Sequence, residues 1–168
     1  GASGYAGMCS GLALDQSSTN QSITLENDPL YTLSNYQLGR LTQAGIVTLR
    51  QSFTKGIVVT DGVTQAPAAS IFRRLAASRC IGAVESLIRE ACEPFVGKQN
   101  SPANRNSLKT AIKANMESVK GKLIEAYDFT IVIDSRVAKF NILNIDYQVV
   151  PIYEIREVHN RITVKDQL

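Results

Sequence analysis

The stretch that most constrains this chain runs from Gly56 to Pro102, where a short strand pattern is followed by a long helix pattern. Three β-branched residues, Ile57 to Val59, lie between glycines, which is typical of a short buried strand. Asp61 and Gly62 then predict a turn. From Pro67 to Val96 apolar residues recur at steps of three and four, which predicts a helix of about seven turns. Its single apolar stripe must be covered by a sheet or by another helix.

The two ends of this helix pattern carry signals of their own. Pro67 suits a first helical turn, where its missing N–H costs nothing, and Gly97 suits the residue just past the end. Pro94 lies inside the last turn and removes a hydrogen bond there. We therefore expect the helix to distort near Glu93.

Length and composition allow one core and argue against two classes of partner. The chain has 168 residues, 44% of them apolar, and a net charge of +3. A domain of this size buries roughly 70% of its extended-chain surface. The charge is too small to indicate nucleic acid by itself, and no apolar run is long enough to predict a membrane span. We expect neither nucleic acid nor a membrane as a partner.

The first residues and the cysteines bear on the context of the protein. The chain opens with Gly1-Ala-Ser-Gly4 and no Met, so we expect a piece of a longer protein.

The chain has three cysteines, Cys9, Cys80 and Cys92. Their odd number and irregular spacing argue against a disulfide scaffold. Cys80 and Cys92 lie about 18 Å apart along the predicted helix, so they cannot pair. Small, buried thiols in a reducing compartment are expected.

The first third of the chain predicts a helix and a hairpin. Residues 1–35 are rich in Gly, Ser, Asn and Gln and are expected to be irregular, apart from a short helix or strand at 8–14. Helical spacing over 33–44 predicts a helix that Gly45 ends. Residues 46–51 alternate in polarity and are expected to pair with 56–60 as a hairpin.

A second helix is predicted after Asn100, with Ser101 as its N-cap and Pro102 as its first residue. Its apolar stripe consists of Leu108, Ile112, Met116, Val119 and Leu123. Beside this stripe lies a basic flank, which we define as Lys109, Lys113 and Lys120. Two interpretations stay open for the flank: an ordinary solvated face, or a cationic surface for an acidic partner.

From Phe129 the apolar period changes to two, which predicts strands. Residues 129–133 are expected to form a buried strand, and 143–149 a half-buried one that Pro151 interrupts. The apolar face then switches near Arg156-Glu157, which indicates a bulge or a move to another sheet. A strand at the end of the chain is free to pair with a sheet edge of its own or of another chain.

Together these patterns predict an α+β fold, a mixed or antiparallel sheet with two long helices packed on one face. No catalytic, cofactor-binding or metal-binding motif is present, so no cofactor or metal is expected. The sole histidine, His159, is a weak candidate for catalysis.

We expect the arginines at 73, 74 and 79 to meet carboxylates. The alternative function is a small-molecule-binding or enzymatic domain, with Asp61, Thr64 and Arg79 lining a site.

The order of several segments resembles the C-terminal domain of contractile phage tail sheath proteins. These segments are Asp61-Gly62-Val63-Thr64, Arg79 in the long helix, 93–105 (Glu-Pro-Phe-Val-Gly-Lys-Gln-Asn-Ser-Pro-Ala-Asn-Arg), Tyr127, Val150-Pro151-Ile152 and the final alternating strand. Residues 2–11, Asn20 and Leu41-Thr-Gln-Ala-Gly45-Ile46 also resemble this family. The resemblance covers nearly the whole chain, from 1 to 168.

This resemblance implies a structural protein, not an enzyme, whose subunits stack as hexameric rings around a tail tube and contract to drive it through the host envelope. The implied location is the virion tail, assembled in the bacterial host cytoplasm. It also implies that residues 152–168 form a linking strand to neighbouring subunits, through Ile152, Tyr153, Ile155, Val158, Ile162 and Val164. The basic flank is the surface we expect to contact the tube. Type VI secretion and R-type bacteriocin sheaths share the domain.

Overall fold

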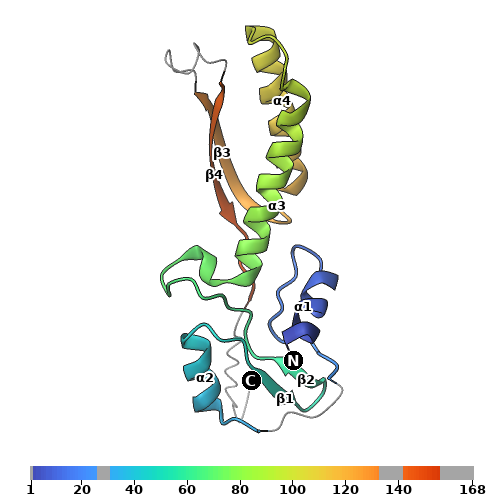
Figure 1. The fold of residues 1–168 in the computed structure, drawn as a ribbon, viewed down its shortest axis with the longest axis vertical. Helices are drawn as coiled ribbons and strands as arrows, with labels where there is room; N and C mark the ends of the chain where they lie inside the picture. The colour runs from blue at the N-terminus through green and yellow to red at the C-terminus, as the bar shows by residue number, and fades with distance from the viewer. Residues whose placement is uncertain (1, 26–30, 133–141, 156–168) are drawn as a thin grey trace, which may run out of the picture.

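The computed structural model describes residues 2–25, 31–132 and 142–155, and they form an elongated molecule with two lobes (Figure 1). The lower lobe contains α1 (Ala2–Gly11), α2 (Asn35–Gln43), β1 (Leu49–Ser52) and β2 (Gly56–Val59). The upper lobe contains α3 (Leu75–Cys92), α4 (Pro102–Val119), β3 (Ile124–Val132) and β4 (Asn144–Pro151). Two short 3-10 helices, η1 (Ile71–Arg73) and η2 (Glu93–Phe95), flank α3. None of the described helices combines the length and apolarity needed to cross a membrane.

The predicted hairpin forms the centre of the lower lobe. Strands β1 and β2 are antiparallel, with Leu49 opposite Val59 and Ser52 opposite Gly56, so β1 begins three residues after the predicted start. A segment that was expected to be irregular, residues 20–23, runs along the other edge of β2. The Val59 amide donates to the Gln21 carbonyl at 3.0 Å, and the Ile23 amide donates to the Ile57 carbonyl at 3.0 Å. β2 thus has a hydrogen-bonded neighbour on each edge, and its residue Val59 is completely buried.

The helix signals at α2 are confirmed. Ser34 and Gln37 form a reciprocal capping box at its start. Gly45 has φ +84°, the left-handed conformation that ends a helix at little cost for glycine. By contrast, α1 occupies residues 2–11, within the stretch that was expected to be irregular except at 8–14.

The long helix starts later than predicted. It begins at Leu75, and Pro67 opens a tight turn in which its carbonyl accepts from the Ser70 amide at 2.9 Å. Arg74 is extended, with φ −93° and ψ 125°, because it forms an antiparallel bridge with Val63. The pairing with a distant segment therefore overrides the helical spacing between 67 and 74.

The end of α3 and the start of α4 agree with the sequence. The regular helix stops at Cys92, and η2, which contains Pro94, replaces its last turn. Gly97 has φ +85°. Ser101 then caps α4 by accepting from the Asn104 amide at 3.2 Å. These ends were predictable because each depends on the residues immediately around it.

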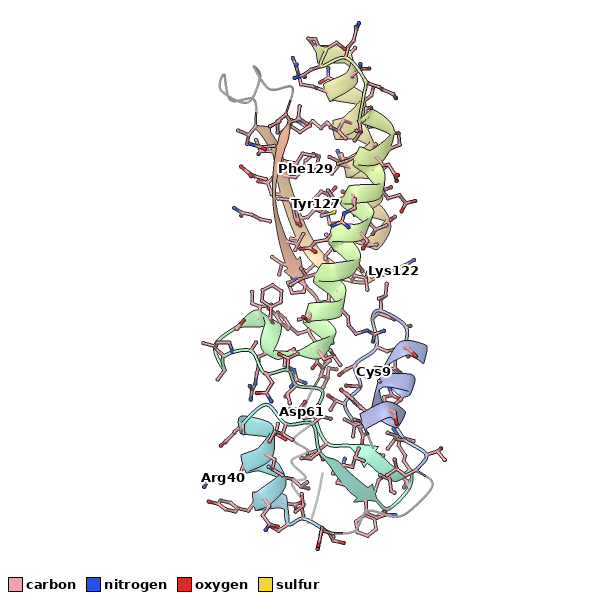
Figure 2. The ribbon with its side chains drawn as sticks, viewed as in Figure 1. Cys9, Arg40, Asp61, Lys122, Tyr127 and Phe129 are labelled. Carbon is pink, nitrogen blue, oxygen red and sulfur yellow. The ribbon has the colours of Figure 1, made fainter. Side chains whose placement is uncertain are left out.

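One apolar core cluster lies in the upper lobe, where α3 and α4 pack together and cover one face of the β3–β4 hairpin (Figure 1). Its buried members are Cys80, Val84, Ile88, Ala91, Leu108, Ile112, Met116, Leu123 and Ile124. Tyr127 and Phe129 lie on the side of the sheet that faces the helices (Figure 2).

The α+β fold with two long helices on one face of a sheet is confirmed, and the described strands pair antiparallel in two separate hairpins. One detail was wrong: the strand expected to be buried from Phe129 onward alternates between half-buried and exposed residues. Helices cover only one face of the two-stranded sheet, so every second side chain stays in water. Ile133 lies outside the described residues.

Candidate functional site: the arginine joint between the lobes

Three arginines near the start of α3 contact the lower lobe, and together we call them the arginine joint: Arg73, Arg74 and Arg79. The sequence predicted that such arginines meet carboxylates. Only Arg74 does so, because Arg73 and Arg79 bind main-chain carbonyls. Figure 2 shows Asp61, the lower-lobe partner of Arg74, at the junction of the two lobes.

Arg74 forms an ion triad with two carboxylates from distant parts of the chain. Its Nη2 lies 2.6 Å from Asp61 Oδ1, and its Nε donates to Glu154 Oε1 at 2.7 Å. The three side chains are only 13%, 8% and 12% exposed, respectively. Burial would lower the pKa of Arg74, but its hydrogen bonds to Asp61 and Glu154 outweigh burial and raise it. The guanidinium therefore stays charged between the two acids.

A hydroxyl and a close backbone approach complete the Asp61 side of the triad. Thr19 Oγ1 donates to Asp61 Oδ1 at 3.2 Å and accepts from the Gly62 amide at 3.0 Å. A Cβ at Gly62 would lie 2.4 Å from Ser18 Oγ, so only glycine fits there without movement. The Asp-Gly turn predicted from the sequence therefore lies in a hydrogen-bonded polar cluster between the lobes.

Arg73 holds the end of α2. Its Nη2 donates to the carbonyls of Thr42 at 2.7 Å and Gln43 at 2.5 Å, which belong to the last turn of α2. Its Nη1 donates to the carbonyls of Thr64 at 3.1 Å and Ala66 at 2.9 Å. A cation at this position satisfies orphan carbonyls and complements the negative end of the helix dipole.

Arg79 holds the segment after α1. Its Nη2 donates to the Leu12 carbonyl at 2.7 Å, and its Nη1 lies 3.4 Å from the Gln16 carbonyl. The alternative small-molecule site was expected to combine Asp61, Thr64 and Arg79. The structure assigns them separate partners, since Thr64 Oγ1 donates to the Phe72 carbonyl. That set of residues therefore does not form one site.

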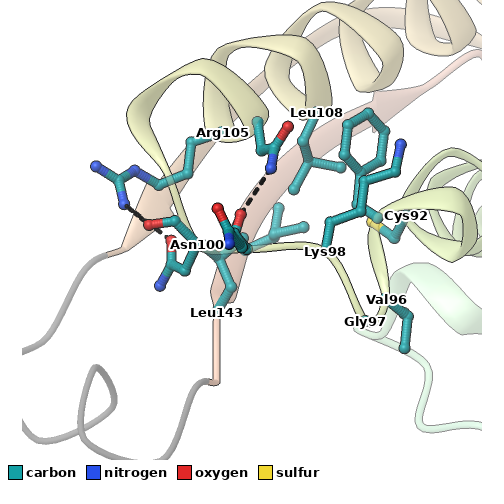
Figure 3. Close-up of a pocket in the computed structure, with 12 residues that line it drawn as sticks. Cys92, Val96, Gly97, Lys98, Asn100, Arg105, Leu108 and Leu143 are labelled. Atoms are coloured by element: carbon teal, nitrogen blue, oxygen red, sulfur yellow. Dashed lines mark hydrogen bonds between the residues drawn. The ribbon is translucent and has the colours of Figure 1, made fainter.

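A pocket of about 280 Å³ lies at the far end of the upper lobe (Figure 3). Apolar side chains such as Leu108 and Leu143 contribute to its wall, and several of its polar side chains bond neighbouring groups. Arg105 Nη1 donates to Asn100 Oδ1 at 2.8 Å, and Asn104 Nδ2 donates to the Gln99 carbonyl at 2.7 Å. The lining contains no His, Asp or Glu, so it offers no acid–base pair. Among the residues described, no cluster of three His, Cys, Asp or Glu side chains is arranged to hold a metal ion.

The three lysines of the basic flank are exposed. Lys109 and Lys113 lie one turn apart on α4, whereas Lys120 is the C-cap residue just beyond the helix. The Lys120 ammonium lies 5.8 Å from the centre of the Tyr127 ring. The flank is thus continuous with an aromatic side chain from β3.

Tyr127 provides a pH-dependent probe of this surface. Partial burial and a 2.7 Å hydrogen bond from its hydroxyl to Glu117 raise its pKa to about 12. Because the folded pKa lies above the unfolded value of about 10, the contribution of Tyr127 to stability is complete below pH 10 and is lost as pH rises toward 12. We expect Glu117→Gln to move the pKa of Tyr127 back toward 10, measured by NMR titration of its ring carbons. Glu125→Gln, an exposed acid of β3, serves as the control; equal titration of Tyr127 in both variants would contradict the assignment.

The described part of the predicted linking strand leaves the upper lobe toward the joint. The Ile152 amide donates to the Leu123 carbonyl at 3.0 Å, and residues 152–155 are not in regular strand conformation. Ile152, Tyr153 and Ile155 are 42%, 53% and 83% exposed. The remaining predicted members, Val158, Ile162 and Val164, lie outside the described residues, as does His159.

Sequence reasoning missed Glu154 as the partner of Arg74 and missed the role of Thr19. The only signal was the charge of Arg74, which predicted a carboxylate but not which one. The three cysteines are free. Cys80 is buried as expected, and burial raises the pKa of its thiol. The expectation of burial was wrong for Cys9 and Cys92, which are partly exposed.

Solved structures of contractile injection particles contain chains with the same fold, among them these three. A chain of the anti-feeding prophage baseplate, 6-fold symmetrised, matches with a TM-score of 0.83 and 17% identity over 96% of this chain and 48% of that one. A chain of the helical sheath of the same particle in the contracted state matches with a TM-score of 0.78 and 20% identity, over 96% and 48%. The contracted PVC sheath complex, an extracellular contractile injection system, matches with 0.80 and 15%, over 97% and 49%.

The TM-scores show a shared fold. The chain spans about half the length of the chains that it matches. No protein-family model matches the sequence, and no curated protein sequence matches it.

Proposed function

We propose that this chain is a domain of a longer sheath subunit that polymerises in a contractile, phage-tail-like injection machine. The observation that carries the proposal is the fold match over at least 96% of the chain, which includes chains from two contracted sheaths. The family resemblance of the sequence, found independently of the fold, points to the same class. The role is mechanical, and the subunit is not an enzyme.

The proposed partners are other copies of the subunit, in hexameric rings, and a tail tube protein. The machine is a tail or tail-like particle assembled in the bacterial host cytoplasm. Two features of the described surface support such contacts. Each strand of the β3–β4 hairpin has one partner among the described residues, so each offers an edge to an added strand. The chain that leaves β4 carries exposed apolar side chains at Ile152, Tyr153 and Ile155.

We infer that residues 152–168 link neighbouring subunits by adding a strand to such an edge. The apolar side chains assigned to this contact are Ile152, Tyr153, Ile155, Val158, Ile162 and Val164. Main-chain hydrogen bonds would supply most of the affinity, and alternate side chains would set the register.

Electron microscopy of the full-length protein tests the proposal. Expressed alone, it is expected to form tubes of sheath-like width, or ring stacks. A truncation before Arg156 keeps the whole described fold and removes the rest of the proposed linking strand, so it serves as the matched comparison. Dispersed monomers from the intact protein, under conditions in which its fold is retained, would contradict the proposal.

The basic flank gives a second, separable prediction. We expect the triple reversal Lys109→Glu, Lys113→Glu and Lys120→Glu to stop the sheath assembling on its tube, because the flank would then repel an acidic tube surface. Assembly with purified tube is scored by electron microscopy. Lys55→Glu and Lys98→Glu, exposed cations elsewhere on the chain, are the controls. Unchanged assembly of the triple variant would show that the flank does not contact the tube, and it would leave the sheath proposal unaffected.

A further inference from the structure

Polar contacts join the two lobes at the arginine joint. The buried apolar cluster belongs to the upper lobe. At the junction, the Leu75 amide donates to the Gly62 carbonyl at 3.0 Å, and Val63 bridges to Arg74. Val63 and Ala77 add only small apolar side chains to the buried area. Directed hydrogen bonds and ion pairs thus join the lobes at this junction.

Arg74 is the point at which three separate segments meet. Asp61 follows β2 in the lower lobe, Arg74 precedes the first residue of α3, and Glu154 lies in the chain that leaves β4. One guanidinium binds both carboxylates, and its Nη2 also lies 3.4 Å from Thr19 Oγ1. A planar, forked donor set of this kind fixes the directions of its partners as well as their distances.

Because the triad is buried, the loss of any one of its three charged side chains is costly. The charges lie in a region from which most water is excluded, so they are screened weakly. Removing one partner leaves a buried charge without full compensation, which is much more costly than breaking an exposed ion pair. Exposed acids on α3, such as Glu90, carry no comparable constraint.

We propose that Arg74 is a positioning residue that locks the lower lobe, α3 and the segment leaving β4 into one rigid body. When the triad is broken, each lobe keeps its own fold, because the β1–β2 hairpin and the upper core do not include Arg74. The lobes then reorient relative to one another, and the direction in which the chain leaves β4 is no longer fixed. This inference concerns the domain itself and holds whether or not the protein polymerises.

Residual dipolar couplings of backbone amides, measured by NMR on the 168-residue chain, test this directly. For the unchanged protein, a single alignment tensor is expected to fit the couplings of α2, β1 and β2 together with those of α3 and α4. For Glu154→Gln and Arg74→Met, the two lobes are expected to require separate tensors of different magnitude. Glu90→Gln makes the same chemical change as Glu154→Gln at an exposed site of α3 and is expected to keep the single tensor.

A charge-neutral variant keeps the proposal falsifiable if Arg74→Met fails to fold. The triple change Asp61→Asn, Arg74→Met and Glu154→Gln removes the ion triad without leaving an uncompensated charge. It is expected to keep the amide chemical shifts of both lobes away from the joint and to show two tensors. A single tensor in this variant would overturn the inference. So would the simultaneous loss of fold in both lobes, because the proposal requires each lobe to fold without the triad.

Discussion

Replacing Ile112 by alanine is expected to lower the free energy of unfolding by about 2–5 kcal/mol. Ile112 is completely buried in the cluster formed by α3, α4 and the sheet. Truncation removes apolar contacts and leaves a cavity that α3 and the sheet, packed against α4, can close only in part. Urea unfolding followed by circular dichroism measures the change.

The neighbouring residue supplies the control for this prediction. Lys113 is exposed on the same helix, and Lys113→Ala is expected to change stability by no more than about 0.5 kcal/mol. A loss below about 1 kcal/mol for Ile112→Ala would mean that the interface between α3, α4 and the sheet is not packed as described. Ile112→Ala should leave amide hydrogen exchange in the lower lobe unchanged under native conditions, because Ile112 has no role in that lobe.

Replacing Arg73 by methionine is expected to destabilise the lower lobe by about 3 kcal/mol. The guanidinium donates to four main-chain carbonyls, two at the end of α2 and two in the loop before η1. Methionine fills a similar volume but donates no hydrogen bond, so these partly buried acceptors lose a charged partner. Faster amide hydrogen exchange in α2 measures the effect locally, and urea unfolding measures it globally.

Two further variants separate charge from geometry at Arg73. Arg73→Lys keeps the charge but replaces the fork by a single ammonium, so it is expected to recover only part of the lost stability. Arg40→Met makes the same change as Arg73→Met on the exposed side of α2 and is expected to stay within about 0.5 kcal/mol of the unchanged protein. Full stability of Arg73→Met would show that α2 does not depend on this cation.

The elements that followed from the sequence are those whose signals are local. The hairpin of β1 and β2, the end of α2 at Gly45, the capped start of α4 and the distortion at Pro94 each depend on residues within a few positions. The apolar stripe of α4 likewise identified the core residues Leu108, Ile112 and Met116. A helix cap, a turn or an amphipathic stripe is stabilised largely by its own neighbourhood, so it can be recognised without knowing the fold.

The start of α3 is a place where local sequence patterns gave the wrong prediction. The helical spacing from Pro67 onward was real, but Arg74 pairs with Val63 and becomes extended. Residues 20–23 looked irregular, yet they complete the hydrogen bonding of β2. In both cases a partner distant along the chain supplied hydrogen bonds that compete with the local preference.

The sequence by itself determined the class of the fold, most of its helices and strands, and the absence of known catalytic motifs. Only the tertiary structure decided how those elements are joined: that Arg74 binds Asp61 and Glu154, which lies 80 positions further along the chain, and that Arg73 and Arg79 bind carbonyls instead of acids. The physical reason is that a charge specifies the kind of partner it needs but not its position. Position is fixed by packing of the whole chain, which brings two carboxylates, Asp61 and Glu154, within reach of Arg74 and buries them there.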